Sequence, residues 1–153
     1  MKNILFLPAF LLCLAGVISL SSCSSSDPAS NPNTTTGVQN TIQSGTWRIT
    51  SFVDKGNDET SHFNGFSFTF GSNNVLTAVN GSNTFAGTWS ISDSNSNDDT
   101  LNDLHFNIQF NLSNDFESLN EDWQIISRTS TRIELIHISG GNGGTAYLTF
   151  EKS

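Results

Sequence analysis

The feature that most restricts the fold of this chain is an alternation of apolar and polar residues along residues 45–150. Successive side chains of a strand point to opposite faces of a sheet, so this period of two predicts strands with one buried face. Phe, Ile, Trp and Thr are frequent in these segments, and all four favour strands. The chain is therefore predicted to be all-β. The predicted strands cover residues 47–53, 66–70, 75–79, 85–91, 104–112, 123–127, 133–138 and 146–150.

The arrangement of these strands is predicted from the short turns that join them. Asn80-Gly81 between two alternating runs is a strong hairpin signal. Residues 115–120 are predicted as a single helical turn. Eight sequential antiparallel strands are most simply satisfied by an up-and-down barrel, because closure leaves no open edge. A two-sheet β-sandwich is the alternative, since the number of strands does not distinguish the two folds.

A repeated local pattern favours the barrel. Gly45-Thr46-Trp47 opens the first predicted strand, and Gly87-Thr88-Trp89 repeats the pattern in the fourth. A glycine before a Trp-bearing strand allows a close backbone approach, at the place where an indole ring closes a barrel end.

The first 22 residues have the organisation of a secretory signal peptide. Lys2 provides a charged start, residues 4–18 form an apolar run, and small residues precede Cys23. A retained transmembrane helix is the alternative, although the run is near the lower limit for crossing a bilayer. Because Cys13 would leave with the signal, Cys23 would be the only thiol of the exported chain.

Leu20-Ser21-Ser22-Cys23 resembles the lipobox of bacterial lipoproteins. This resemblance implies cleavage before Cys23, with lipid attached to its sulfur and to its new amino group. Several acyl chains make a stable membrane anchor, since each buried CH₂ contributes about 0.8 kcal/mol. Ser24 follows the cysteine where Asp would indicate inner-membrane retention, so the outer membrane of the cell envelope is the predicted location.

The chain is predicted to have three parts: a signal peptide at 1–22, a flexible tether at 23–43 and a barrel domain at 44–153. The tether is rich in Ser, Asn and Thr, and Ala29, Val38 and Ile42 are its apolar residues. Such a stretch buries too little surface to offset the entropy of ordering it.

The folded part resembles the small lipocalin-like lipoproteins of bacteria. Gly45-x-Trp47 is similar to the first-strand signature of lipocalins, and Gly87-Thr88-Trp89-x-Ile91 matches those lipoproteins in order and rough spacing. The resemblance extends over residues 44–152. It implies an eight-stranded lipocalin-like barrel, with Arg128 or Arg132 as candidates for the basic residue that packs over the first-strand Trp.

The inward face of the predicted barrel is the candidate ligand site. A barrel of eight strands is wide enough to fill with side chains or to hold one small ligand. The large rings at these positions either line an apolar cavity or occupy it. The predicted interior residues are Trp47, Phe66, Phe68, Phe70, Phe85, Trp89, Phe106, Ile108, Phe110, Ile133, Leu135 and Phe150.

Other chemistry finds little support in the sequence. Six Lys and Arg against 14 Asp and Glu argue against binding to a nucleic acid backbone. The loop from Asp93 to Asp99 lacks the Gly and Glu of an EF-hand, so it is expected to be a solvated turn, with a weak calcium site as the alternative. His62, His105 and His137 are scattered and are expected at exposed or rim positions. No cofactor, metal site or catalytic nucleophile is predicted.

These observations predict a lipid-anchored barrel that is not an enzyme and binds a small apolar or amphipathic ligand. The membrane would be contacted through Cys23. The alternative is an envelope module, structural or interacting with another protein, whose barrel core is filled.

Overall fold

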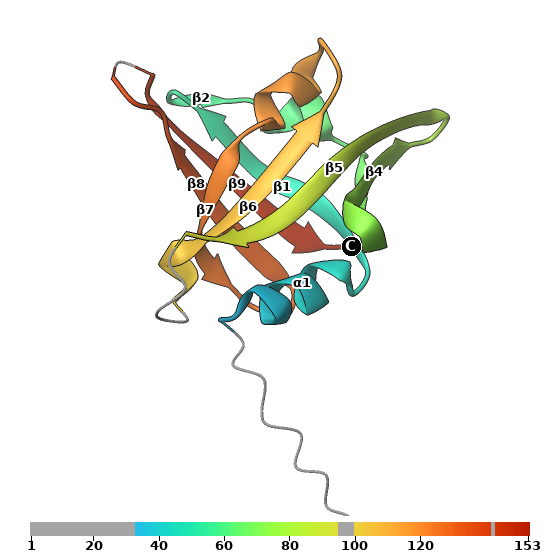
Figure 1. Ribbon diagram of the computed structural model, residues 1–153. Helices are drawn as coiled ribbons and strands as arrows, with labels where there is room; N and C mark the ends of the chain where they lie inside the picture. Colours follow the sequence, from blue (N-terminus) through green and yellow to red (C-terminus); the bar gives the residue numbers. More distant parts are fainter. Residues whose placement is uncertain (1–32, 95–99, 142) are drawn as a thin grey trace, which may run out of the picture.

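The computed structural model describes residues 33–94, 100–141 and 143–153, and strands dominate this part of the chain (Figure 1). One α-helix precedes the strands, and short 3₁₀ turns (η) join several of them. The elements are α1 (Thr35–Gln43), β1 (Thr46–Asp54), β2 (Asn57–Asp58), η1 (Thr60–Phe63), β3 (Ser67–Phe70), η2 (Ser72–Asn74), β4 (Val75–Asn80), β5 (Asn83–Asp93), η3 (Leu101–Asp103), β6 (Leu104–Phe110), η4 (Asp115–Leu119), β7 (Asp122–Arg128), β8 (Arg132–Ile138) and β9 (Thr145–Lys152).

The strands form a closed antiparallel barrel. Within the described residues, the hydrogen-bonded order runs from β1 through β3, β4, β5, β6, β7 and β8 to β9, and β9 pairs with β1 again. Ile49 lies opposite Phe150 across this closing pair. The short β2 is added to β1 outside the cycle of eight. The prediction of an eight-stranded barrel is confirmed, and the sandwich alternative is wrong.

The period-two pattern places the large apolar side chains inside. In β6, Leu104, Phe106, Ile108 and Phe110 are each at most 2 % exposed, while the residues between them face outward. The predicted close approach at Gly87 is also present, because a Cβ there would lie 2.5 Å from the carbonyl oxygen of Gln109. Only glycine fits this position without moving β6.

A β-bulge interrupts the alternation in β1. The register with β9 shifts between Ile49 and Ser51, so two residues of β1 occupy the space of one. Phe52 consequently points inward and is 1 % exposed, whereas Val53 is half-buried. Strict alternation would place Val53 on the same face as Trp47 and Ile49, but the bulge reverses the parity beyond it.

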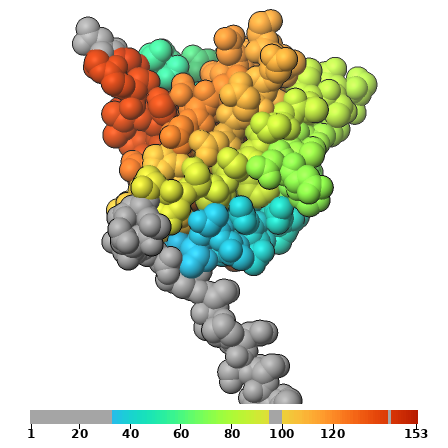
Figure 2. Space-filling model, in the orientation of Figure 1, coloured from blue at the N-terminus to red at the C-terminus, as the bar shows by residue number. Residues whose placement is uncertain are grey.

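The helix α1 covers one end of the barrel (Figures 1 and 2). The side chain of Thr34 accepts a hydrogen bond from the Gly37 N–H at 3.1 Å and so caps the helix. Val38 and Ile42, one turn apart, are fully buried, and the helix lies against β3 and β5. The predicted tether is therefore wrong for residues 35–43, because these two side chains are enough to dock a turn-forming segment on an apolar barrel end.

The opposite end is covered by η1 and η4 (Figure 1). Phe63 of η1 and Phe116 of η4 have ring centroids 5.4 Å apart and are 1 % and 2 % exposed. The predicted helical turn at residues 115–120 is present as the 3₁₀ turn η4. Both barrel ends thus carry a short helical cover.

Candidate ligand-binding cleft

The predicted interior residues do line the inside of the barrel. Ten of the twelve are buried, and Phe66 and Phe85 are half-buried at the end covered by η1 and η4. The rings contact one another directly. The ring centroids of Phe70 and Phe106 are 5.3 Å apart, and the ring centroids of Phe68 and Phe150 are 5.5 Å apart. These distances are those of packed aromatic pairs, so the rings occupy much of the space that a ligand would need.

A residue from outside the strands completes this packing. Phe116 inserts from η4, with its ring centroid 4.9 Å from Phe110, 4.9 Å from Phe85 and 5.0 Å from Phe66. The segment is held by Asn120, whose side chain hydrogen-bonds both the N–H and the carbonyl of Phe110. Asn120 thereby continues the pairing of β6 where β7 has not yet begun. The Phe116 ring therefore fills the barrel interior at this end.

At the end covered by α1, the two tryptophans of the Gly-x-Trp motifs donate hydrogen bonds to main-chain carbonyls. Trp47 Nε1 donates to the carbonyl of Ile42 at 2.7 Å, and Trp89 Nε1 donates to the carbonyl of Gly71 at 3.0 Å. Lys152 Nζ lies 5.4 Å from the Trp47 ring, so this lysine makes a cation–π contact there. Arg128 donates to the carbonyl of Gly37 at 3.0 Å, and burial lowers its pKa.

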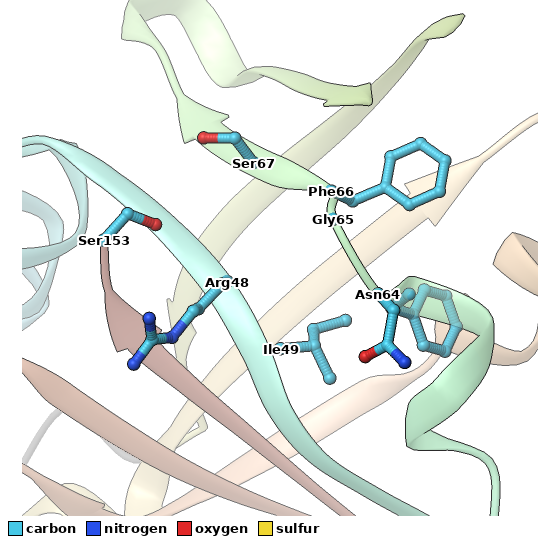
Figure 3. A pocket seen from close by; sticks show the side chains of 8 residues that line it. Arg48, Ile49, Asn64, Gly65, Phe66, Ser67 and Ser153 are labelled. Atoms are coloured by element: carbon cyan, nitrogen blue, oxygen red, sulfur yellow. The ribbon is translucent and has the colours of Figure 1, made fainter. Parts of the chain in front are cut away.

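The barrel wall is open between β1 and β3. These strands pair at two positions, Thr46 with Thr69 and Trp47 with Phe68, and then diverge. A cleft of about 320 Å³ lies where they separate (Figure 3). Its lining residues are Arg48, Ile49, Phe63, Asn64, Gly65, Phe66, Ser67 and Ser153.

A tight turn shapes one side of this cleft. The Phe66 N–H donates to the Phe63 carbonyl at 3.1 Å, Asn64 has φ −60° and ψ 131°, and Gly65 has φ +79°. These angles are those of a type II turn, which needs glycine at its third position. The Asn80 side chain donates to the Asn64 carbonyl at 3.1 Å and fixes the turn against the β4–β5 hairpin.

The cleft is apolar at depth and polar at its rim. Ile49 and Phe63 are 5 % and 1 % exposed, whereas Arg48 and Asn64 are exposed. Figure 3 shows Ile49 directed toward the turn and Arg48 on the other side of the β1 ribbon. The alternation of apolar and polar residues does not indicate this cleft. The Asn64-Gly65 turn signal between two phenylalanines was the one available clue.

A row of ion-paired side chains crosses the outer face of β1, β9 and β8 beside the cleft. Arg132 contacts Glu151 at 2.5 Å and Glu134 at 2.7 Å, while Arg48 contacts Glu151 at 3.7 Å. Hydrogen bonds from Ser127 and then Arg132 lower the pKa of Glu134, and hydrogen bonds from Glu134 and Glu151 raise the pKa of Arg132. Arg132 is thus the nearest basic partner of both carboxylates.

The three histidines lie at two separate places. His105 contacts Asp122 at 2.7 Å, and His137 contacts Glu121 at 3.3 Å where β7 begins. His62 lies in η1, at the barrel end that η1 and η4 cover, 3.4 Å from Glu59 and 3.7 Å from Asp115. In the described residues, no group of three or more His, Cys, Asp or Glu is arranged to hold a metal ion.

Two further predictions concern residues outside the described part of the chain. Cys23, the predicted lipid attachment site, is one of them, and the loop from Asp93 to Asp99 is described only through residue 94. Among the described residues, no helix has the length and apolar character needed to cross a membrane.

Comparisons with known proteins give one match to a solved structure. No family model and no curated protein matches this chain. A DUF4847 family protein from Bacteroides vulgatus ATCC 8482 is similar in structure, with 20 % sequence identity and a TM-score of 0.49. The similarity covers 76 % of this chain and 98 % of that protein.

Proposed function

We propose that this chain is a lipid-anchored, non-enzymatic binding protein of the cell envelope, and that it takes a small amphipathic ligand in the cleft between β1 and β3. One observation carries the proposal. The two strands separate after two paired positions and leave a cleft of about 320 Å³, whereas the barrel interior is occupied by contacting rings. Small-molecule sites begin at about 300 Å³, so the cleft suits a small ligand or one end of a longer ligand.

The lining of the cleft supports an amphipathic ligand. Ile49, Phe63 and Phe66 provide apolar contact at depth, and each CH₂ buried there contributes about 0.8 kcal/mol. Asn64 and Ser67 provide hydrogen-bonding groups at the rim. A molecule with an apolar tail and a polar head matches this order of surfaces.

The anchor in this proposal is Cys23, and the outer membrane is the proposed location because Ser24 follows it. The described chain begins beside α1, so the lipid would attach at the α1 end of the barrel (Figure 1). Twelve positions separate Cys23 from the start of α1, so even a fully extended chain would hold the domain within about 40 Å of the attached lipid.

Substitution of the anchoring cysteine tests the location. We expect Cys23→Ala to move the protein from the membrane fraction to the soluble fraction of the envelope, because the acyl chains provide the membrane affinity. Cell fractionation of the variant beside wild type measures this distribution. A variant that remains in the membrane fraction as wild type does would overturn the anchor.

Blocking the cleft tests the binding site. We expect Ser67→Phe to abolish ligand binding, because the ring would fill the cleft between β1 and β3. Thr69→Phe is the matched control, since Thr69 is an exposed residue of the same strand and lies where β3 is still paired with β1. Isothermal titration of the full chain with fatty acids, porphyrins and isoprenoids measures binding to wild type and to both variants.

The results separate the cleft from other sites. Binding that survives Ser67→Phe would place the ligand elsewhere, inside the barrel above all. Absence of binding to the whole panel would favour the second candidate, an envelope protein-interaction module. The packed interior is the observation that supports this second candidate, because a filled barrel offers its outer surface and loops for recognition.

A further inference from the structure

We infer that the ligand carries an anionic head group and that Arg48 binds it, which makes the ligand an amphiphile with a carboxylate or phosphate head. This inference rests on the proposed function and names the chemistry of its ligand. The carrying observation is the charge of the cleft compared with the other hollows of the described surface.

Arg48 makes this cleft electrostatically different from the other hollows. The side chains that line the cleft include one cation, Arg48, and no Asp or Glu. The hollow at the η1–β2 surface contains Asp58, the hollow between η1 and η4 contains three carboxylates, and the hollow at β7 and β8 contains Asp122. In a chain with a net charge of −8, the cleft is therefore the described hollow best suited to an anion.

The guanidinium of Arg48 is available for such a ligand. The Arg48 side chain is 57 % exposed, and its contact with Glu151 is long, at 3.7 Å. Glu151 is bound more closely by Arg132, at 2.5 Å, so it stays paired when Arg48 turns away. In Figure 3 the Arg48 side chain extends toward β9, so binding of the head group requires the guanidinium to turn toward the cleft.

The rim of the cleft supplies further donors for an anion. Ser67 at the start of β3 and Asn64 on the type II turn line the same cleft as Arg48 (Figure 3). A hydroxyl and an amide each donate to a carboxylate or phosphate oxygen, and an arginine binds such groups with two parallel N–H donors. The tail would then lie on Ile49 and Phe63.

The test compares four probes that differ in head and tail. Decanoate, decanol, decyltrimethylammonium and acetate are titrated into the full chain by calorimetry, below the micelle-forming concentration. We expect decanoate to bind most tightly, with Arg48→Gln weakening it by about five- to tenfold, the order expected for a partly exposed charge-assisted contact. Lys55→Gln is the matched control, because it removes the same charge from an exposed lysine beyond β1.

A second variant tests whether Arg48 exchanges Glu151 for the head group of the ligand. Glu151→Gln removes the carboxylate that holds Arg48, so decanoate binding should become tighter in this variant and acetate binding should stay weak. Thermal unfolding of each variant checks that the fold is retained.

Each outcome decides one of the two proposals. Decanol binding as tightly as decanoate, or Arg48→Gln leaving decanoate unchanged, would overturn the anionic head and leave the cleft proposal standing. Acetate binding as tightly as decanoate would overturn the amphiphile, because the tail would contribute nothing. If none of the four probes binds, the proposed function itself fails.

Discussion

Replacing Phe116 with alanine is expected to lower the free energy of unfolding by about 3–5 kcal/mol, the range found for large aromatic residues in a core. Phe116 is 2 % exposed, and its ring lies within 6.0 Å, centroid to centroid, of the rings of Phe63, Phe66, Phe68, Phe85 and Phe110. The loss has two parts: less apolar surface is removed from water, and a cavity remains because neighbouring strands are held by pairing.

Urea denaturation of the full chain measures this loss. Phe116→Leu is the control, expected to lose about 1–2 kcal/mol because leucine keeps most of the buried apolar volume. Asn120 still hydrogen-bonds Phe110 in both variants, so η4 should stay in place over the new cavity. A loss well below 1 kcal/mol for the alanine variant would mean that Phe116 does not close this end of the barrel.

Replacing Trp47 with alanine is the second large effect, again about 3–5 kcal/mol. Trp47 is fully buried, and its indole N–H is the donor for the carbonyl of Ile42 in α1. The substitution removes packing under α1 and leaves a buried carbonyl without its donor. Amide exchange in α1 should accelerate more than exchange in β6, because α1 depends on this contact and β6 does not.

Two further variants separate packing from hydrogen bonding at this end. Trp47→Phe keeps much of the ring contact but lacks the N–H, so we expect a loss of about 1–3 kcal/mol. Thr46→Ala changes the exposed neighbour in the same strand and should cost little. If Trp47→Ala and Thr46→Ala are equally mild, the indole does not tie α1 to the barrel.

Local patterns were sufficient to predict the strands and their inward residues. Leu104, Phe106, Ile108 and Phe110 alternate strictly, and each is buried. The pattern failed in β1, where the bulge after Ile49 turns Phe52 inward. A bulge follows from how β1 pairs with β9, and nothing within the nine residues of β1 indicates its position.

The helix α1 was missed for a related reason. Its sequence is polar, and Val38 and Ile42 alone do not stabilise a helix in water. They become enough only when the barrel end offers Trp47 and the surface of β3 and β5 for docking. The N-cap Thr34 and the spacing of four residues were weak signs of this helix.

The cleft likewise depends on how strands that are separate in the chain pair with one another. Arg48 and Ser67 come from different strands and line one cleft because β1 and β3 diverge after two pairs. Asn64-Gly65 predicted a turn, but the neighbours of that turn depend on the barrel closure. The charges beside it, Arg132 with Glu134 and Glu151, are likewise set by register across β8 and β9.

By itself, the amino-acid order determined which segments become strands and which side chains point inward, because the period of two is a property of each strand alone. Tertiary structure decided where the barrel closes, where a bulge reverses the faces, which segment covers each end and where the wall opens. These features depend on contacts between residues distant in the chain, and only the closed barrel brings those residues together.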